Sequence, residues 1–202
     1  YLSKNLEILQ KNTIAGFNIN CVGDRNNWSF LPSKNENSYC DRVSRNILKK
    51  LKINYKEYSF LERGSDERQY CSPGIDLPVC SIMRSKYDTF NEYHTSLDDL
   101  NFVSSEGLNE TFNVYKNIFN FIEKDYLPKV KILAEPFMSK RGLRSSIGRR
   151  GSANSSKDIM NFLIYSDGKN SISDISKKTK IPLKKAYKLM NLLSELKLIE
   201  LT

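Results

Sequence analysis

The sequence is poor in the residues from which self-contained metal sites and disulfide frameworks are built. It has a single histidine, His94, and four cysteines, none of which forms a Cys-x-x-Cys pair. This spacing excludes zinc fingers and a dense disulfide framework, and it predicts reduced structural thiols in a cytoplasmic protein. No apolar run approaches the roughly 18 residues that cross a membrane. The first residues mix acid and base and lack the apolar centre of a signal peptide.

The positive charge is confined to the C-terminal part of the chain. The 202 residues carry a net charge of +9, but residues 129–202 hold 16 Lys and Arg against 6 Asp and Glu. Residues 1–128 are therefore close to neutral and lack the cationic field that attracts nucleic acid. Hydrophobic residues make up 39% of the chain, which is enough for packed cores and argues against disorder.

Strand and helix patterns alternate along the first 123 residues. Alternating apolar residues predict strands, and apolar residues three or four apart predict helices. The last helix is expected to turn Leu108, Phe112, Tyr115, Phe119 and Ile122 to the core. The expected order is helix 1–12, strand 16–22, polar irregular segment 25–40, helix 41–51 capped by Asp41, strand 55–61, loop 64–74, buried strand 77–83 and helix 104–123. This order is typical of an α/β sandwich with a largely parallel sheet.

A second, smaller domain follows a break in composition. Residues 134–154 are rich in Gly, Ser and Arg and are predicted to be a linker, from which Glu135-Pro136-Phe137 and Leu143 could dock on a neighbouring surface. Three short helices and a terminal strand follow, which is typical of an α+β winged helix-turn-helix. They are expected at 156–165, 171–178, 181–196 and 198–201. The predicted domains are therefore residues 1–133 and 155–202.

One stretch concentrates the residues that point to chemistry. It contains Gly64-Ser-Asp-Glu-Arg-Gln, then Cys71-Ser-Pro-Gly-Ile-Asp-Leu-Pro, and later Glu92-Tyr-His-Thr-Ser-Leu-Asp. A neutral imidazole such as that of His94 is a common zinc ligand, and it needs an acceptor on its other nitrogen, which Asp98 or Asp99 could supply. Taken by itself, a lone histidine is more often an ordinary surface or core residue.

These motifs, with Arg141-Gly-Leu and Ser166-Asp-Gly, resemble in order and spacing those of a bacterial family of zinc aminopeptidase-like proteins with a C-terminal winged helix. That family is related to leucyl aminopeptidases and glutaminyl cyclases and is often encoded with polysaccharide-biosynthesis genes. The resemblance covers essentially the whole chain. It implies that residues 1–133 are the C-terminal half of a three-layer α/β domain of a zinc-dependent hydrolase, acting on a peptide-like or amide substrate in surface polysaccharide biosynthesis.

The resemblance also implies roles for particular residues. His94 matches the last metal ligand of the family, and Asp24, just after the first strand, matches a ligand carboxylate, although aspartate is common in such turns. Arg68 is implied to bind a substrate carboxylate or phosphate, or to remain a solvated charge. Glu67 stands where the wider superfamily has histidine, so the family's role is not expected to transfer to it. The residues implied to line the cleft or to stand behind the metal are Asp66, Glu67, Arg68, Tyr93 and Asp98.

The implied set of metal ligands is incomplete. The family supplies a first histidine, a bridging aspartate and a catalytic glutamate upstream of the part that this chain resembles, and the chain has no second histidine. Because zinc takes three or four protein ligands, the chain as given is expected to bind zinc weakly, to hold no catalytic residue and to be inactive. In the complete protein the resemblance implies attack by metal-bound hydroxide, with the upstream glutamate as general base.

The winged helix supports other interpretations. Lys184, Lys185 and Lys188 on its third helix could meet DNA phosphates. That helix has no arginine and one amide, Asn191, with which to read bases, so we expect it to dock a protein and not nucleic acid. No membrane partner is expected. A DNA-binding regulator and a catalytically inactive scaffold in glycan assembly remain alternatives to the hydrolase.

Overall fold

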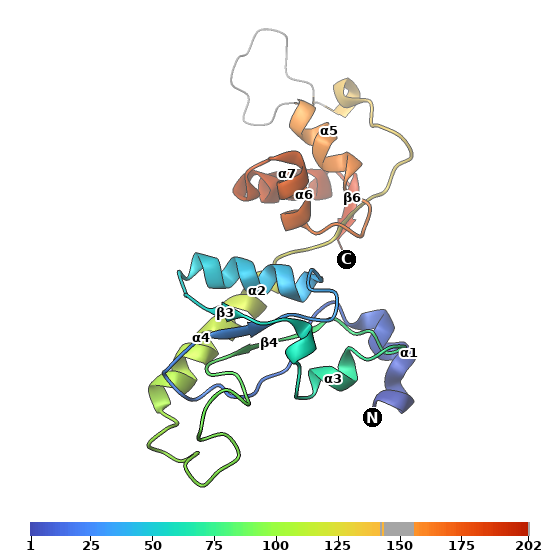
Figure 1. Ribbon diagram of the computed structural model, residues 1–202. Helices are drawn as coiled ribbons and strands as arrows, with labels where there is room; N and C mark the ends of the chain where they lie inside the picture. Colours follow the sequence, from blue (N-terminus) through green and yellow to red (C-terminus); the bar gives the residue numbers. More distant parts are fainter. Residues whose placement is uncertain (142, 144–155, 202) are drawn as a thin grey trace. The chain divides into compact units, whose positions relative to one another are not determined.

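The structure, a computed structural model, describes residues 1–141, 143 and 156–201 (Figure 1). The chain divides into two compact units, Tyr1–Phe121 and Ile122–Thr202. Among the helices of the described residues, none combines the length and the apolar character needed to cross a membrane. Each unit has its own hydrophobic core and is described separately.

The first unit combines helices with one small sheet. Its elements are α1 (Leu2–Asn12), β1 (Gly16–Phe17), β2 (Ser29–Leu31), α2 (Tyr39–Lys50), β3 (Lys56–Glu57), a 3-10 helix (Phe60–Glu62), α3 (Glu67–Tyr70), β4 (Val79–Met83) and α4 (Ser105–Ile122). The predicted α/β class is confirmed. The helices at 1–12, 41–51 and 104–123 and the strand at 77–83 all have counterparts close to their expected bounds.

The sheet is mixed in direction, with strand order β1-β4-β2-β3. The β1–β4 and β2–β3 pairs are parallel, as predicted, but the central β4–β2 pair is antiparallel. Strand β2 lies inside the segment 25–40, for which an irregular structure is predicted above. Its three residues are all buried, and a strand this short is too brief for an alternating pattern to show.

Both faces of the sheet are covered by helices, which is why all five residues of β4 are buried. Cys80 points to α2, where its Sγ lies 3.5 Å from Ser44 Oγ. Successive side chains of a strand alternate between faces, so Val79 and Met83 point the other way, into a cluster that includes Leu2 and Leu9 of α1. In Figure 1, α2 runs along one side of the sheet and α3 lies on the other.

Helix α2 begins one turn earlier than its predicted cap. Ser38 is the N-cap, and Asp41 is the third helical residue, whose carboxylate accepts from the backbone N–H of Ser38 at 2.8 Å. This reciprocal arrangement is a capping box. Asp41 therefore does help to start the helix, but from inside its first turn.

The face of α4 that packs on the sheet differs from the predicted one. Tyr115 is buried as expected, but Leu108, Phe112 and Phe119 are 46%, 63% and 46% exposed, so their prediction as core residues is wrong. The buried face consists of Gly107, Thr111, Val114, Tyr115 and Ile118. Small residues in the first turns let the helix approach the chain at Gly23, and this close contact, which has no apolar signature, decides which face is buried.

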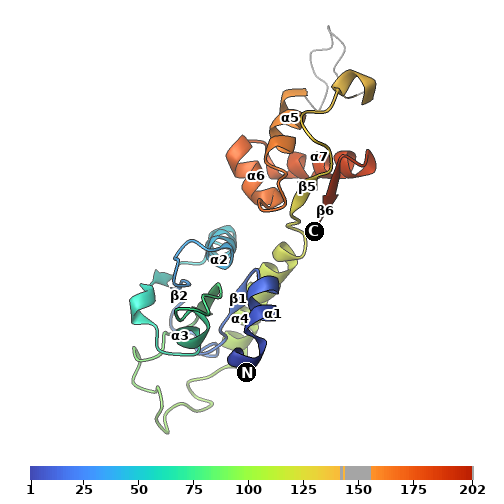
Figure 2. The same cartoon turned by 90° about the vertical axis from the view of Figure 1, so that its right-hand side faces the viewer.

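The second unit is a winged helix, as predicted. Its elements are β5 (Pro128–Val130), a 3-10 helix (Met138–Arg141), α5 (Ser156–Ile164), α6 (Ile172–Thr179), α7 (Leu183–Glu195) and β6 (Ile199–Leu201). Strand β5 pairs antiparallel with β6, so residues 122–133, predicted to be part of the first domain, belong to this unit. Figure 2 shows this strand pair beside the three helices.

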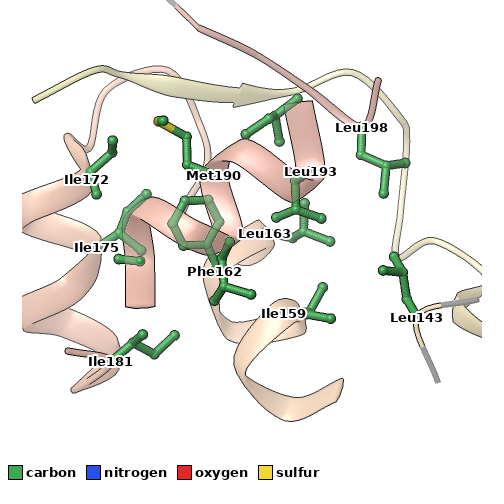
Figure 3. Packing of buried hydrophobic residues seen from close by; sticks show 13 residues of the cluster. Leu143, Ile159, Phe162, Leu163, Ile172, Ile175, Ile181, Met190, Leu193 and Leu198 are labelled. Carbon is green, nitrogen blue, oxygen red and sulfur yellow. The ribbon is translucent and has the colours of Figure 1, made fainter. Parts of the chain in front are cut away.

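The core of the winged helix is apolar throughout. Figure 3 shows side chains of the three helices converging on it, and Leu143, from the predicted linker, joins them with 9% exposure. The rest of that linker lies largely outside the described residues. The labelled members of the core are Leu143, Ile159, Phe162, Leu163, Ile172, Ile175, Ile181, Met190, Leu193 and Leu198.

Candidate functional site

Asp24, the predicted carboxylate ligand, lies at the carboxyl end of β4 in the first unit. It is 2% exposed. Its Oδ2 accepts from the backbone N–H of Ser85 at 2.9 Å, and its Oδ1 accepts from Ser85 Oγ and from the backbone N–H of Asn26, both at 2.9 Å. Because Ser85 is the second residue after β4, these bonds tie the turn at Asp24 to the end of the central strand. The carboxylate is thus held in one orientation.

Helix α4 fixes the same turn from another side. The backbone N–H of Ser104 donates to the carbonyl of Gly23 at 2.9 Å, and Thr111 Oγ1 donates to the carbonyl of Val22 at 3.0 Å. A Cβ placed on Gly107 would lie 2.2 Å from the Gly23 carbonyl oxygen. The glycine is therefore what allows the helix to press directly on the turn that carries Asp24.

Acidic side chains gather around the thiol of Cys21, three residues before Asp24. Burial raises the pKa of Cys21 to about 11, and the charges of Asp24, Asp98 and Asp88 act in the same direction. These interactions require the carboxylates to lie within electrostatic range of the thiol. Asp98, on the loop that carries His94, therefore lies within electrostatic range of Cys21.

His94 lies on an exposed loop with a left-handed backbone, at φ 56°. Its ring stacks on that of Tyr93, with centroids 3.9 Å apart and planes 17° apart. Tyr93 in turn contacts Phe90 and Tyr87, with centroids 5.6 and 6.4 Å away. This aromatic row anchors the imidazole to the buried Tyr87. Among the described residues, neither Asp98 nor Asp99 hydrogen-bonds to His94, and Asp99 instead accepts from Asn101, so the expected tautomer-fixing contact is not made here.

Glu67, predicted to line the cleft, is instead fully buried, and both of its carboxylate oxygens accept hydrogen bonds. Its Oε1 accepts from Tyr87 Oη at 2.7 Å and from the backbone N–H groups of Gly64 and Ser65 at 3.0 and 2.9 Å. Its Oε2 accepts from Asn18 Nδ2 at 2.5 Å. Burial acts to raise the pKa of Glu67, but these hydrogen bonds outweigh it, and the pKa is lowered. Glu67 therefore joins the chain after β1, the loop at 64–67 and Tyr87.

The neighbours of Glu67 differ from it in exposure. Asp66 is exposed and lines a cavity of about 340 Å³ beside Asn18 and Tyr70. Arg68 is also exposed, and it forms no ion pair within the described parts of the chain. The three consecutive residues thus have separate surroundings and do not form one constellation.

The residues of this chain do not fit a complete zinc site. His94 and Asp24 are two donors, whereas zinc takes three or four. In the described part of the chain, the one group of three metal-binding residue types with ligand atoms within 4.8 Å of one another is Cys40, Asp41 and Cys80. There the Asp41 carboxylate already accepts from Ser33 N and Oγ and from Ser38 N and Oγ. That group lies where the buried start of α2 meets β4.

Comparison with known proteins places the chain in a family. Residues 1–125 match the family described as "Domain of unknown function (DUF4910)", and residues 126–201 match a winged helix-turn-helix family. The chain belongs to the DUF4910 family. The two matched families divide the chain close to the boundary between its two compact units.

Two proteins from Clostridium acetobutylicum are similar to this chain. One, from Clostridium acetobutylicum, is named "Putative polysaccharide biosynthesis protein with aminopeptidase-like domain"; it is 37% identical over 183 residues, which cover 89% of this chain and 41% of that protein. The other is a crystal structure titled as that of a "putative peptidase" from the same organism, with a TM-score of 0.67 and 31% identity, covering 100% of this chain and 44% of that one. This DUF4910 chain thus spans less than half the length of either.

Several residues of the site are not predicted from the sequence. Ser85 and Asn18 bind the carboxylates of Asp24 and Glu67, and Tyr87 binds Glu67 while supporting Tyr93. Each stands just beyond the end of a strand, where functional side chains of α/β folds commonly gather. Their position after a strand is the one feature of the sequence that could have identified them, because the residue types themselves are common.

Proposed function

We propose that this DUF4910 chain is the C-terminal part of an aminopeptidase-like hydrolase that acts on a peptide-like or amide substrate in surface polysaccharide biosynthesis. The observation that carries the proposal is the Asp24 turn at the carboxyl end of β4, whose carboxylate is held by Ser85 and Asn26. The similarity to the two clostridial proteins supports the same class. His94 and Asp24 would stand on one wall of the substrate site.

The proposal includes zinc binding only for a protein as long as the two clostridial relatives. The two donors of this chain fall short of the three or four that zinc takes, so the remaining ligands would come from outside these 202 residues. The role of this part of the fold is then to hold Asp24 in one orientation through Ser85 and Asn26. The aromatic row would position the imidazole of His94.

The test compares the 202-residue chain with a full-length protein that contains it. We expect the full-length protein to retain zinc through dialysis and to release the chromophore from aminoacyl anilides, and the chain alone to do neither. His94→Ala should lower the zinc content and the hydrolysis rate at least about tenfold, a loss of about 1.4 kcal/mol or more. The matched control is Asn91→Ala, an exposed residue three positions before His94. Unchanged zinc content in His94→Ala would overturn the assignment.

For the winged helix we propose docking to a protein, with DNA binding as the alternative under test. Of the three lysines that could meet phosphates, Lys185 lies 2.6 Å from Asp158 in an ion pair, while Lys184 and Lys188 are exposed. A carboxylate held against the third helix opposes an approaching phosphate. We expect no band shift when the chain is mixed with duplex DNA at low salt, where electrostatic binding is strongest. A salt-dependent shift lost in the double variant Lys184→Gln, Lys188→Gln would favour the DNA-binding alternative.

A further inference from the structure

A cavity of about 640 Å³ opens at the edge of the sheet where β4 ends and where β2 and β3 begin. The strand register explains its position, because Ser29 pairs with both Met83 and Lys56. Residues just beyond these positions, among them Trp28 and Arg84, therefore come to one place. The lining residues are Arg25, Asn26, Asn27, Trp28, Ser29, Asn54, Tyr55, Lys56, Tyr58, Arg84, Ser85, Lys86 and Thr89.

All the charged residues that line the cavity are positive. The lining includes four cationic side chains, those of Arg25, Lys56, Arg84 and Lys86, and no carboxylate. Arg84 and Lys86 are 3% and 5% exposed. Arginine and lysine are rarely buried to this degree without a counter-charge, since taking a charge out of water is costly. Arg84 has one in Glu110, which lies outside the lining, whereas Lys86 forms no ion pair with a described carboxylate. The lining therefore carries an excess of positive charge that suits an anion.

The guanidinium of Arg84 is only partly satisfied by the protein. Its Cζ lies 4.2 Å from the centroid of the Trp28 ring, and its Nη1 donates to Glu110 Oε2 at 2.7 Å. Its buried Nε has no hydrogen-bond partner in the described structure. The guanidinium is thus held against Trp28 and paired with one carboxylate, that of Glu110.

Two ammonium groups share one aromatic ring on another side of the cavity. The Nζ atoms of Lys86 and Lys56 lie 5.4 and 4.5 Å from the centroid of the Tyr58 ring. Lys86 Nζ also lies 4.1 Å from the Tyr87 ring centroid and donates to the Tyr87 carbonyl at 3.2 Å. The ring faces attract both cations, but neither lysine forms an ion pair with a described carboxylate. No described carboxylate therefore neutralises the charge of either lysine.

We propose that this cavity binds a phosphorylated small molecule. A phosphate group carries about −2 charge at pH 7 and three strong acceptor oxygens, which would match the excess of cations in the lining. Arginine and lysine together are the side chains that bind phosphate oxygens. The cavity adjoins the Asp24 turn through Arg25 and Ser85, but the proposal does not depend on hydrolysis or on zinc.

Trp28 makes the proposal directly measurable, because it is the one tryptophan of the chain and lines the cavity. Inorganic pyrophosphate is titrated into the 202-residue chain at low salt, and Trp28 emission is recorded. We expect a saturable change at roughly millimolar concentration or below. Galacturonate, a carboxylate sugar, is titrated in parallel and should bind at least about tenfold more weakly. Absence of a saturable change, or tighter binding of galacturonate, would overturn the proposal.

Matched lysine variants separate the cavity from general surface charge. Lys56 is exposed while lining the cavity, and Lys52 is exposed four residues earlier and lies outside it. Lys56→Gln should weaken pyrophosphate binding about fivefold to tenfold, which is about 1 kcal/mol, while Lys52→Gln should leave it unchanged. Equal thermal unfolding of both variants confirms that the fold is kept. Equal weakening by the two substitutions would show attraction to net charge alone and would also overturn the proposal.

Discussion

Glu67→Gln tests whether the buried carboxylate organises the first unit. The substitution keeps the size of the side chain and removes its charge. Three donors, Tyr87 Oη and the N–H groups of Gly64 and Ser65, converge on one oxygen, and Asn18 donates to the other. An amide can still accept the three bonds. Its NH₂ group would face the NH₂ group of Asn18, so the Asn18 amide must turn over.

The expected loss follows from these bonds. Hydrogen bonds to a charged group contribute about 1.5–3 kcal/mol and neutral ones about 0.5–1.5 kcal/mol, so three weakened bonds cost roughly 1 kcal/mol each. We expect Glu67→Gln to lower the free energy of unfolding of the first unit by about 3 kcal/mol at pH 7. Urea unfolding followed by Trp28 emission reports this unit, because Trp28 lies in it and is the single tryptophan.

The loss of unfolding free energy caused by Glu67→Gln should become smaller at low pH. The pKa of Glu67 is lowered in the folded chain, so the unfolded chain binds more protons in the range between the folded pKa and the ordinary value of about 4.3. Stability from Glu67 is therefore complete above the ordinary pKa and is lost as the pH falls through the folded pKa. The difference between Glu67→Gln and the unchanged protein should shrink below about pH 4.

The control is Glu7→Gln, an exposed residue of α1. It should change the free energy of unfolding by no more than about 0.5 kcal/mol, as is usual for surface positions. If Glu67→Gln also stayed within about 0.5 kcal/mol at pH 7, or if its deficit did not change with pH, the assigned role of the carboxylate would be refuted.

Two further predictions test the Asp24 turn. Gly107→Ala would place a Cβ 2.2 Å from the Gly23 carbonyl oxygen, so it should lower the free energy of unfolding of the first unit, measured in urea, by about 1–3 kcal/mol. The control is Asn109→Ala, at an exposed position of the same helix, which should not lower it. A Gly107→Ala chain that is more stable than the unchanged protein would contradict the close contact. Removing the negative charge of Asp98 should lower the pKa of Cys21 from about 11 and speed its alkylation by iodoacetamide at pH 8, as measured by mass spectrometry of the Cys21 peptide. Asp99→Asn is the control, and equal rates in the Asp98→Asn and Asp99→Asn variants would place Asp98 away from Cys21.

Some features of this protein can be predicted from local pattern alone. The continuous apolar run at 77–83 predicts the fully buried β4, and the apolar periodicity of residues 156–201 predicts the three helices and the last strand of the winged helix. The order of the Gly64, Cys71 and His94 motifs is enough to indicate an aminopeptidase-like family. Pattern works in these cases because each signal depends on neighbours in the chain.

Other features depend on contacts between distant segments. The sequence indicates that α4 is a helix, but its buried face follows from Gly107 meeting the carbonyl of Gly23, far away in the chain. Strand β2 exists because residues 29–31 pair with β4 and β3, and no periodicity marks three residues. Glu67 resembles a cleft residue in sequence because charged residues usually lie in water, whereas four donors from separate segments stabilise its charge inside.

The sequence by itself thus determined the class of the fold, most of its helices, the winged helix and the resemblance to an aminopeptidase-like family. The tertiary structure alone decided which charges are buried, how Asp24 is oriented, and that Arg84, Lys56 and Lys86 surround one cavity. The physical reason is that secondary structure and motif order are properties of adjacent residues. A binding site is made by residues that become neighbours only when strands pair and helices pack.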